Sequence, residues 1–140
     1  MNDVTAWRAA LAEWQRARAL MDAFYDIGPM YRASEDWRLG RQYLVDTYGS
    51  IDNAKQDPAG AQEFERIWSH HKSWEDRQEE FYGPADEAAR QLILTPAPDL
   101  DAILVKIDVT KKHELHFENE MGGEPWDIIS AELRAIGGAA

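Results

Sequence analysis

The sequence predicts an all-α protein, in which a long, kinked antiparallel helical hairpin carries two shorter C-terminal helices and the whole forms a helix bundle. Apolar residues recur at alternating steps of three and four along most of the chain. No segment of useful length alternates apolar and polar residues as a strand would. The connections are short, which favours antiparallel neighbours. A length of 140 residues fits a single helical domain over 1–140.

The first arm of the hairpin is predicted to hold two helices, over about residues 4–27 and 29–48. Gly28-Pro29 separates them, because proline lacks an amide donor and clashes with the preceding turn. Turn-rich residues from 49 to 57 end the arm. The inward stripes are Trp7, Ala10, Trp14, Ala17, Met21 and Phe24, then Met30, Ala33, Trp37, Leu44 and Tyr48.

The second arm is predicted as one helix over about residues 58–93. Asp57 can cap its free amides, and Pro58 suits the first helical position. The three–four spacing continues across Gly83-Pro84, which predicts a kink there and not a break. The stripe consists of Phe64, Ile67, His71, Trp74, Gln78, Phe81, Ala85, Ala88 and Leu92.

Two shorter helices are predicted after the stiff connector Thr95–Asp99. The first covers about residues 99–118 and includes the β-branched stretch Val105–Val109, because the apolar spacing continues through it. Gly122-Gly123 ends it, and Pro125 opens the last helix, over about 125–136. The predicted inward residues are Leu100, Ile103, Leu104 and Ile107, then Trp126, Ile129, Leu133 and Ile136.

The composition excludes several classes of protein. The absence of cysteine excludes disulfide scaffolds, cysteine-ligated zinc, iron–sulfur clusters and thiol nucleophiles. The net charge is −11, with −2 over residues 1–58 and −9 over residues 59–140, and phosphate backbones repel such a chain. Direct nucleic-acid binding is therefore unexpected. Met1–Thr5 does not begin like a secretory signal, and no apolar run approaches a membrane span, so we expect a cytoplasmic protein or one inside an assembled particle.

The segment Leu94–Ile107, LTPAPDLDAILVKI, resembles a recurring element of small helical alphaproteobacterial proteins, often prophage-associated and without an assigned function. In them a TPAPDLxAL-like element links a long helical hairpin to a short C-terminal helical part. The chain follows this plan over residues 60–137, whereas Gly28-Pro29 and the linker at 49–57 depart from it. The resemblance implies a helical architecture and a mobile-element origin, with a place in the cytoplasm or a phage-derived particle. It implies no activity, cofactor or site residue.

Histidine spacing gives weak candidates for a metal site. His71 and Glu75 are one helical turn apart, as are His113 and His116 approximately, so either pair could present two ligands on one face. A metal site needs three or four convergent ligands, and neither His-Glu-x-x-His nor the di-iron Glu-x-x-His spacing occurs. The alternative is that His71 is a polar residue of the helix seam and that His113 and His116 lie near a helix end. We predict no cofactor.

Two surfaces are candidates for binding a partner. Tyr31, Trp37, Arg38 and Arg41 belong to a run of aromatic and arginine residues, the side chains enriched at protein interfaces. The alternative is a core stripe flanked by arginines whose stems lie along it. Glu75, Asp76, Glu79 and Glu80 form an acidic group, which is either a solvated helix face or a surface that imitates phosphates.

The sequence therefore favours a non-enzymatic helical protein that binds another protein or assembles with itself. No Gly-x-Ser-x-Gly elbow or glycine-rich phosphate loop occurs. One alternative is an acidic inhibitor that imitates nucleic acid and binds a basic host or defence protein. A second alternative is a metal-dependent helical enzyme.

Overall fold

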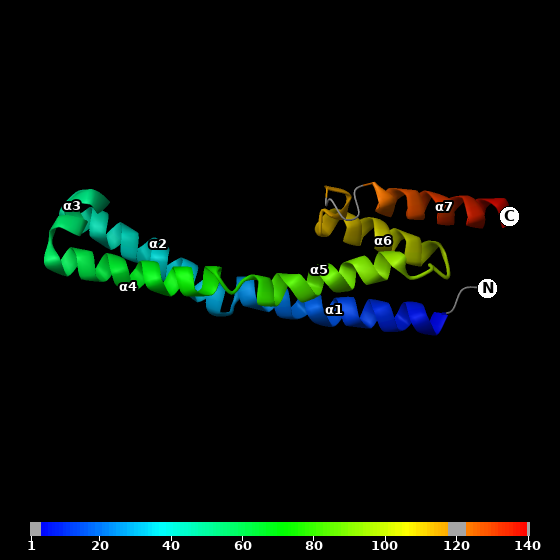
Figure 1. Cartoon of the computed structure of the whole chain (residues 1–140), viewed down its shortest axis with the longest axis horizontal. Coiled ribbons are helices and arrows are strands. Elements are labelled where there is room, and N and C mark those ends of the chain that lie inside the picture. The colour runs from blue at the N-terminus through cyan, green and yellow to red at the C-terminus, as the bar shows by residue number, and fades with distance from the viewer. Residues whose placement is uncertain (1–3, 118–122, 140) are drawn as a thin grey trace. The chain divides into compact units, whose positions relative to one another are not determined.

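The computed structural model describes residues 4–117 and 123–139, and every regular element within them is helical. Figure 1 shows the helices in chain order. They are α1 (Val4–Asp26), α2 (Pro29–Tyr48), α3 (Ile51–Gln56), α4 (Pro58–Glu75), α5 (Glu79–Leu94), α6 (Leu100–Lys112), the 3₁₀ helix η1 (Leu115–Phe117) and α7 (Glu124–Ala139). The predicted all-α helix bundle with a long hairpin is confirmed. No helix in the described part of the chain is both long and apolar enough to cross a bilayer.

The chain divides into two compact units. Unit 1 consists of Met1–Arg18 and Gly83–Ala140, and unit 2 consists of Ala19–Tyr82. Helices α1 and α5 each contribute residues to both units. Each unit contains three of the six tryptophans, which supply large buried area for its packing.

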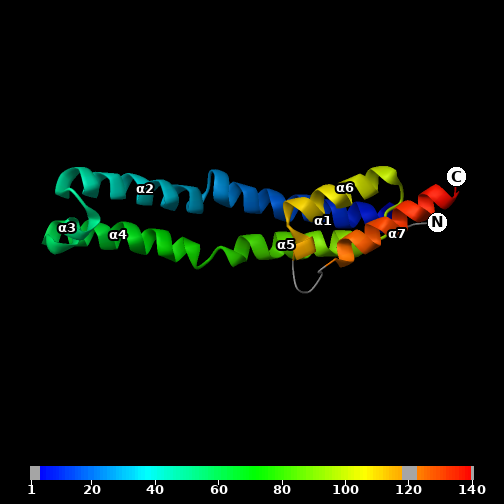
Figure 2. The same ribbon diagram turned by 90° about the horizontal axis from the view of Figure 1, so that it is seen from above.

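Unit 2 is built around the α2–α4 hairpin. Figure 2 shows α2 and α4 side by side, with α3 at the turn between them. Its core is formed by Leu44, Ala54 and Ile67, all fully buried. Gly40 lets the two helices approach closely, because a Cβ at this position would lie 2.7 Å from Cγ2 of Ile67. The apolar side chains packed around the core are Trp37, Tyr48, Ile51 and Phe64.

The predicted linker at 49–57 was wrong in part, because it contains helix α3. Ser50 caps this helix by accepting a hydrogen bond of 3.0 Å from the amide of Asn53. The buried Ala54 then packs against the start of α4, where Gly60 leaves room for its carbonyl oxygen. Asp57 caps α4 as predicted, since its Oδ2 accepts from the amide of Gly60 at 3.0 Å. Six residues are too few for periodicity to reveal such a helix.

The single helix predicted over 58–93 was also wrong, because the break lies at residues 76–78. Gln78 stabilises the interruption: its side-chain amide donates to the carbonyl oxygen of Glu75 at 3.1 Å and accepts from the hydroxyl of Tyr25 at 2.9 Å. Pro84 lies inside α5, where the helix continues through it. The predicted kink was therefore placed too late in the chain.

An aromatic cluster lies beside this break within unit 2. The rings of Phe24 and Phe81 are stacked, with centroids 3.8 Å apart and planes inclined by 3°. Trp74 packs on Phe24 with a centroid separation of 6.1 Å. This cluster joins the end of α1 to the residues on both sides of the interruption between α4 and α5.

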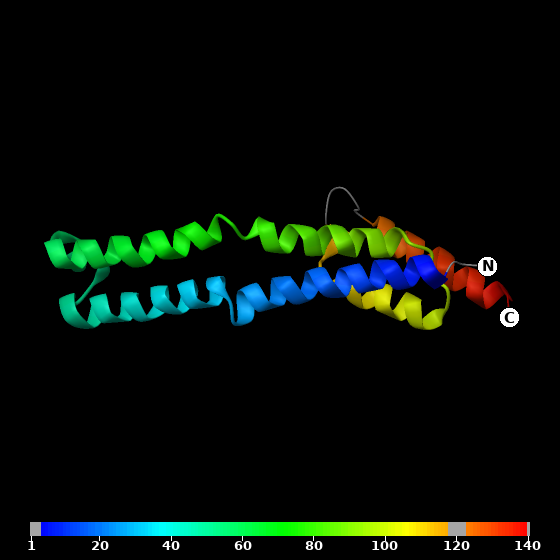
Figure 3. The same cartoon turned by 90° about the horizontal axis from the view of Figure 1, so that it is seen from below.

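Unit 1 packs residues 4–18 of α1 and 83–94 of α5 with α6 and α7. Figure 3 shows α1 and α5 side by side, with α6 along them. Asp99 caps α6 by accepting from the amide of Ala102 at 2.9 Å. The fully buried core side chains of this unit include Ala85, Ala89, Leu92, Ile93, Ile103, Val109 and Leu115.

The prediction for α6 needs two corrections. The helix ends at Lys112 and a 3₁₀ turn follows, while residue 118, the predicted end, lies outside the described residues, as does Gly122. Its buried face is also rotated: Leu100 and Leu104 are 50% and 56% exposed, whereas Lys106 is fully buried. The rotation of α6 follows from a polar interaction of Lys106 that no apolar periodicity can show.

Helix α7 continues to Ala139, beyond its predicted end at 136.

Candidate protein-interaction surface

Four of the predicted partner-binding residues lie on α2, and the structure brings three of them together. Trp37, Arg38 and Arg41 line a shallow hollow of about 330 Å³ together with Gln42 and Val45. Tyr31 lies on the same helix outside the hollow and is 47% exposed. We call this part of α2, from Tyr31 to Val45, the α2 surface.

The floor of the hollow is held rigidly by α4. The ring of Trp37 packs against Phe64 and Trp68, with centroids 5.7 Å and 5.5 Å away. The imidazole of His71 stacks on the same indole at 5.6 Å with planes 27° apart. The guanidinium of Arg41 lies 5.4 Å from the Trp37 centroid, within the range of a cation–π interaction. The hollow is thus formed before any partner arrives.

Further apolar side chains extend the α2 surface into solvent. Leu39 and Tyr43 are each 56% exposed, and Val45 is 39% exposed. The sequence prediction missed Leu39, Gln42 and Val45. Helical spacing could have found Val45, because it follows Arg41 by four positions and so lies on the same face of the helix.

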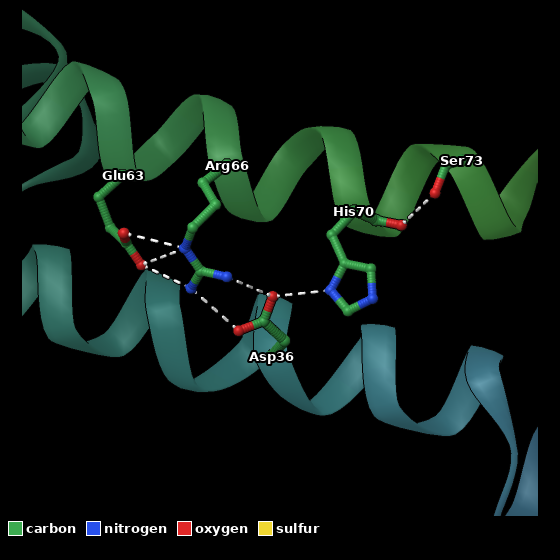
Figure 4. A network of polar contacts seen from close by, with 5 residues as sticks. All are labelled: Asp36, Glu63, Arg66, His70 and Ser73. Carbon is green, nitrogen blue, oxygen red and sulfur yellow. Dashed lines mark hydrogen bonds and ion pairs between the residues drawn. The ribbon is translucent and has the colours of Figure 1, made fainter.

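A polar network beside the α2 surface fixes α2 against α4 (Figure 4). Arg66 donates two hydrogen bonds to the carboxylate of Asp36, of 3.0 Å and 3.2 Å. It also binds Glu63 in its own helix at 2.7 Å. Nδ1 of His70 lies 2.9 Å from Oδ2 of Asp36, and Ser73 donates to the backbone carbonyl of His70 at 2.8 Å. The hydrogen bonds from Arg66 and then His70 hold the pKa of Asp36 below its usual value.

The acidic group lies at the junction of α4 and α5, and part of its charge is neutralised locally. Asp76 forms an ion pair with Lys72. Glu80 forms one with Arg77 at 2.9 Å, and this hydrogen-bonded partner lowers the pKa of Glu80. All four carboxylates, Glu75, Asp76, Glu79 and Glu80, belong to exposed residues. The arrangement has the i, i+3 and i, i+4 pairs of a solvated helix surface.

The four metal candidates are divided between the two units. His71 and Glu75 belong to unit 2, whereas His113 and His116 belong to unit 1. Within the first pair, Nδ1 of His71 and Oε2 of Glu75 are 3.5 Å apart. The part of the chain that the structure describes contains no group of three or more histidine or acidic side chains able to hold a metal ion.

His113 instead sits in a buried polar cluster of unit 1. Its Nδ1 is 2.7 Å from Oδ1 of Asp86, and its Nε2 is 3.0 Å from Nε1 of Trp14. An indole N–H can only donate, so Nε2 accepts and Nδ1 carries the proton that is donated to Asp86. Arg18 also approaches Nε2, at 3.3 Å. Both ring nitrogens of His113 are therefore engaged within the protein.

A scan of protein-family models, a search of curated proteins and a search of solved structures each found no match to this chain.

Proposed function

We propose that the chain is a non-enzymatic helical protein that binds another protein, or a second copy of itself, through the α2 surface. The observation that carries this proposal is the hollow around Trp37, which is also lined by Arg38, Arg41 and the partly exposed Val45. Tryptophan, tyrosine and arginine are the side chains that contribute most to binding at protein interfaces.

Two features of the α2 surface support binding over a purely structural role. Trp37 is immobilised by α4, so little side-chain entropy would be lost when a partner covers it. Arg41 makes no ion pair with any described residue, so its charge is available to an acidic group of the partner. Arg38, in contrast, is already paired with Glu35 at 2.8 Å.

The resemblance of Leu94–Ile107 to an element of prophage-associated proteins extends the proposal to the origin of the chain. If the chain is encoded by a prophage, its partner is a host or phage protein, met in the cytoplasm or in a phage-derived particle. The alternative of an acidic inhibitor has weaker support, because Lys72 and Arg77 neutralise two of the four carboxylates proposed to imitate phosphates.

A capture experiment tests the proposal. The tagged full chain is incubated with an alphaproteobacterial lysate, and bound proteins are identified by mass spectrometry after washes at low and high salt. The variant Arg41→Ser/Val45→Ser changes two residues that line the hollow on α2. The control, Leu100→Ser/Leu104→Ser, removes exposed apolar area from α6. Light scattering on the purified chain detects self-association.

A partner, or a dimer, that is retained by the control and lost in the α2 variant supports the proposal. Equal retention by both variants places the interface elsewhere. A partner lost only because of high salt moves support to the acidic inhibitor, since salt screens charge-dominated binding. A monomer that captures no protein but turns over a small molecule excludes the proposal.

A further inference from the structure

Unit 1 contains a second, larger hollow, which is independent of the α2 surface. It has a volume of about 450 Å³ and lies between the α5–α6 connector and α7. Its walls are mostly apolar, with Leu94 and Pro96 from the connector region and Ile128, Ala135 and Ile136 from α7. This volume is within the range of small-molecule sites.

The polar end of the hollow is formed by a lysine–glutamate pair. Nζ of Lys106 donates to Oε1 of Glu132 at 2.7 Å and to the carbonyl oxygen of Ile93 at 2.9 Å. The other carboxylate oxygen of Glu132 accepts from the amide of Ala97 at 2.6 Å. Two hydrogen bonds leave the carboxylate with further acceptor positions, because its two oxygens provide about four.

Burial decides which member of the pair can meet a ligand. The side chain of Lys106 is fully buried, whereas that of Glu132 is 18% exposed. A ligand in the hollow would therefore meet a hydrogen-bond acceptor, and not the ammonium group. Because the positive charge of Lys106 already compensates Glu132, a cationic ligand would gain little from the carboxylate. The net charge of −11 disfavours an anionic ligand.

We infer that this hollow binds a small, neutral, mainly apolar molecule that carries one O–H or N–H donor, with the donor on the carboxylate of Glu132. The apolar body would cover Leu94 and Ile136, which are 51% and 38% exposed and border the opening. Burial of such area is the favourable contribution to binding, and the single donor sets the orientation of the molecule.

The test is an NMR titration of the ¹⁵N-labelled full chain with indole, and separately with 1-methylindole. The two probes have almost the same shape, but only indole has an N–H. Indole is expected to shift the amide signals of Leu94, Thr95 and Ala97 and of residues 128–136. 1-Methylindole should bind about tenfold more weakly, as expected for the loss of one hydrogen bond to a charged acceptor.

Two variants locate the binding. Ala135→Phe fills the hollow from an exposed position and should abolish the shifts. Ala9→Phe makes the same substitution at an exposed position of α1 outside the hollow and should leave them unchanged. Thermal unfolding of both variants checks that each remains folded.

Four outcomes would overturn the inference. These are equal binding of the two probes, no shift up to the solubility limit of indole, shifts that persist in Ala135→Phe, and concentration-dependent shifts of the same amides without any probe. The last outcome would show that a second copy of the chain covers the hollow. None of these outcomes bears on the α2 surface, which lies in unit 2.

Discussion

The indole N–H of Trp14 donates to Nε2 of His113 across 3.0 Å, and this contact determines which nitrogen of the buried imidazole carries the proton. The proton must be on Nδ1, where the carboxylate of Asp86 accepts it at 2.7 Å. Positions 14 and 113 are far apart in the sequence, so the contact ties α1 to the end of α6 within unit 1.

Trp14→Phe should therefore destabilise unit 1 by about 1–3 kcal/mol, because it removes the donor and leaves a buried acceptor less well satisfied. Long-range ¹H–¹⁵N spectra of the imidazole in the wild type should show the Nδ1-protonated tautomer. Urea unfolding measures the free energy, with Trp68→Phe, at a 40% exposed position, as the control. An Nε2-protonated His113 would contradict the arrangement.

Asp36→Asn should weaken the α2–α4 hairpin in a pH-dependent manner. Arg66 and His70 lower the pKa of Asp36 in the folded state, so the carboxylate contributes stability above its unfolded pKa of about 3.9. That contribution is lost as the pH falls through the lower folded value. We expect a loss of about 1 kcal/mol at pH 7 that shrinks below a pH of about 4, measured by urea unfolding.

The control for Asp36 is its neighbour Glu35. Glu35→Gln removes an exposed ion pair with Arg38 inside one helix, which should change stability little because solvent screens it. Equal effects of the two substitutions would mean that the contacts of Asp36 across the hairpin add nothing to stability.

Gly60→Ala should strongly destabilise unit 2, by about 2 kcal/mol or more, because the new methyl group would overlap the carbonyl oxygen of the buried Ala54. The neighbour is backbone, so it cannot move aside as a flexible side chain would. Gly138→Ala is the matched control in α7, where nothing lies within 4 Å of the added Cβ. This second change should be neutral or stabilise the helix by up to about 1 kcal/mol. Thermal unfolding of the two variants distinguishes them.

Lys106→Met should cost about 2–4 kcal/mol of stability, since it leaves Glu132 without its cation in a largely buried position. In the Lys106→Met background, Glu132→Gln should recover part of the loss by removing the unpaired charge. Urea unfolding of the single and double variants measures both effects. No recovery in the double variant would show that the charge of Glu132 is not the cause.

The pH dependence of Lys106 has the same sign as that of Asp36, but it lies in an alkaline window of pH. Burial lowers the pKa of Lys106, so the unfolded chain holds more protons between the folded value and the ordinary value of about 10.4. Stability therefore rises with pH in that window. The free energy of unfolding of the wild type, relative to Lys106→Met, should increase as the pH approaches 10. A flat difference would contradict the lowered pKa.

The sequence predicted a helix correctly wherever a single apolar stripe ran along it. The stripe of α1 placed Trp7, Trp14 and Phe24 in the core, and the cap at Asp57 lies where expected. The wrong predictions concern residues whose partners are distant in the sequence. The buried face of α6 is determined by Lys106, whose burial is stabilised by Glu132 of α7. No local spacing contains that information.

The candidate site was predictable in composition but not in geometry. The aromatic and arginine residues of α2 were identified from their types, and three of them do line one hollow. The network that holds this helix in place was not, because Asp36 and Arg66 belong to different helices and meet only after the hairpin closes. Likewise, the spacing of His113 and His116 suggested a shared ligand set, whereas the fold engages His113 with Trp14 and Asp86.

Each unit contains three tryptophans, so tryptophan fluorescence can report the unfolding of each unit. Replacing the indoles of one unit by phenylalanine, at positions where no indole N–H is needed, would leave emission that follows the other unit alone. Coincident melting of the two signals would define one cooperative folding unit. Separate transitions would define two cooperative folding units. A species with one unit folded and the other unfolded would then be populated. In such a species the unfolded unit would expose its parts of α1 and α5, the two helices shared by both units, to proteases and chaperones. The other unit would remain native.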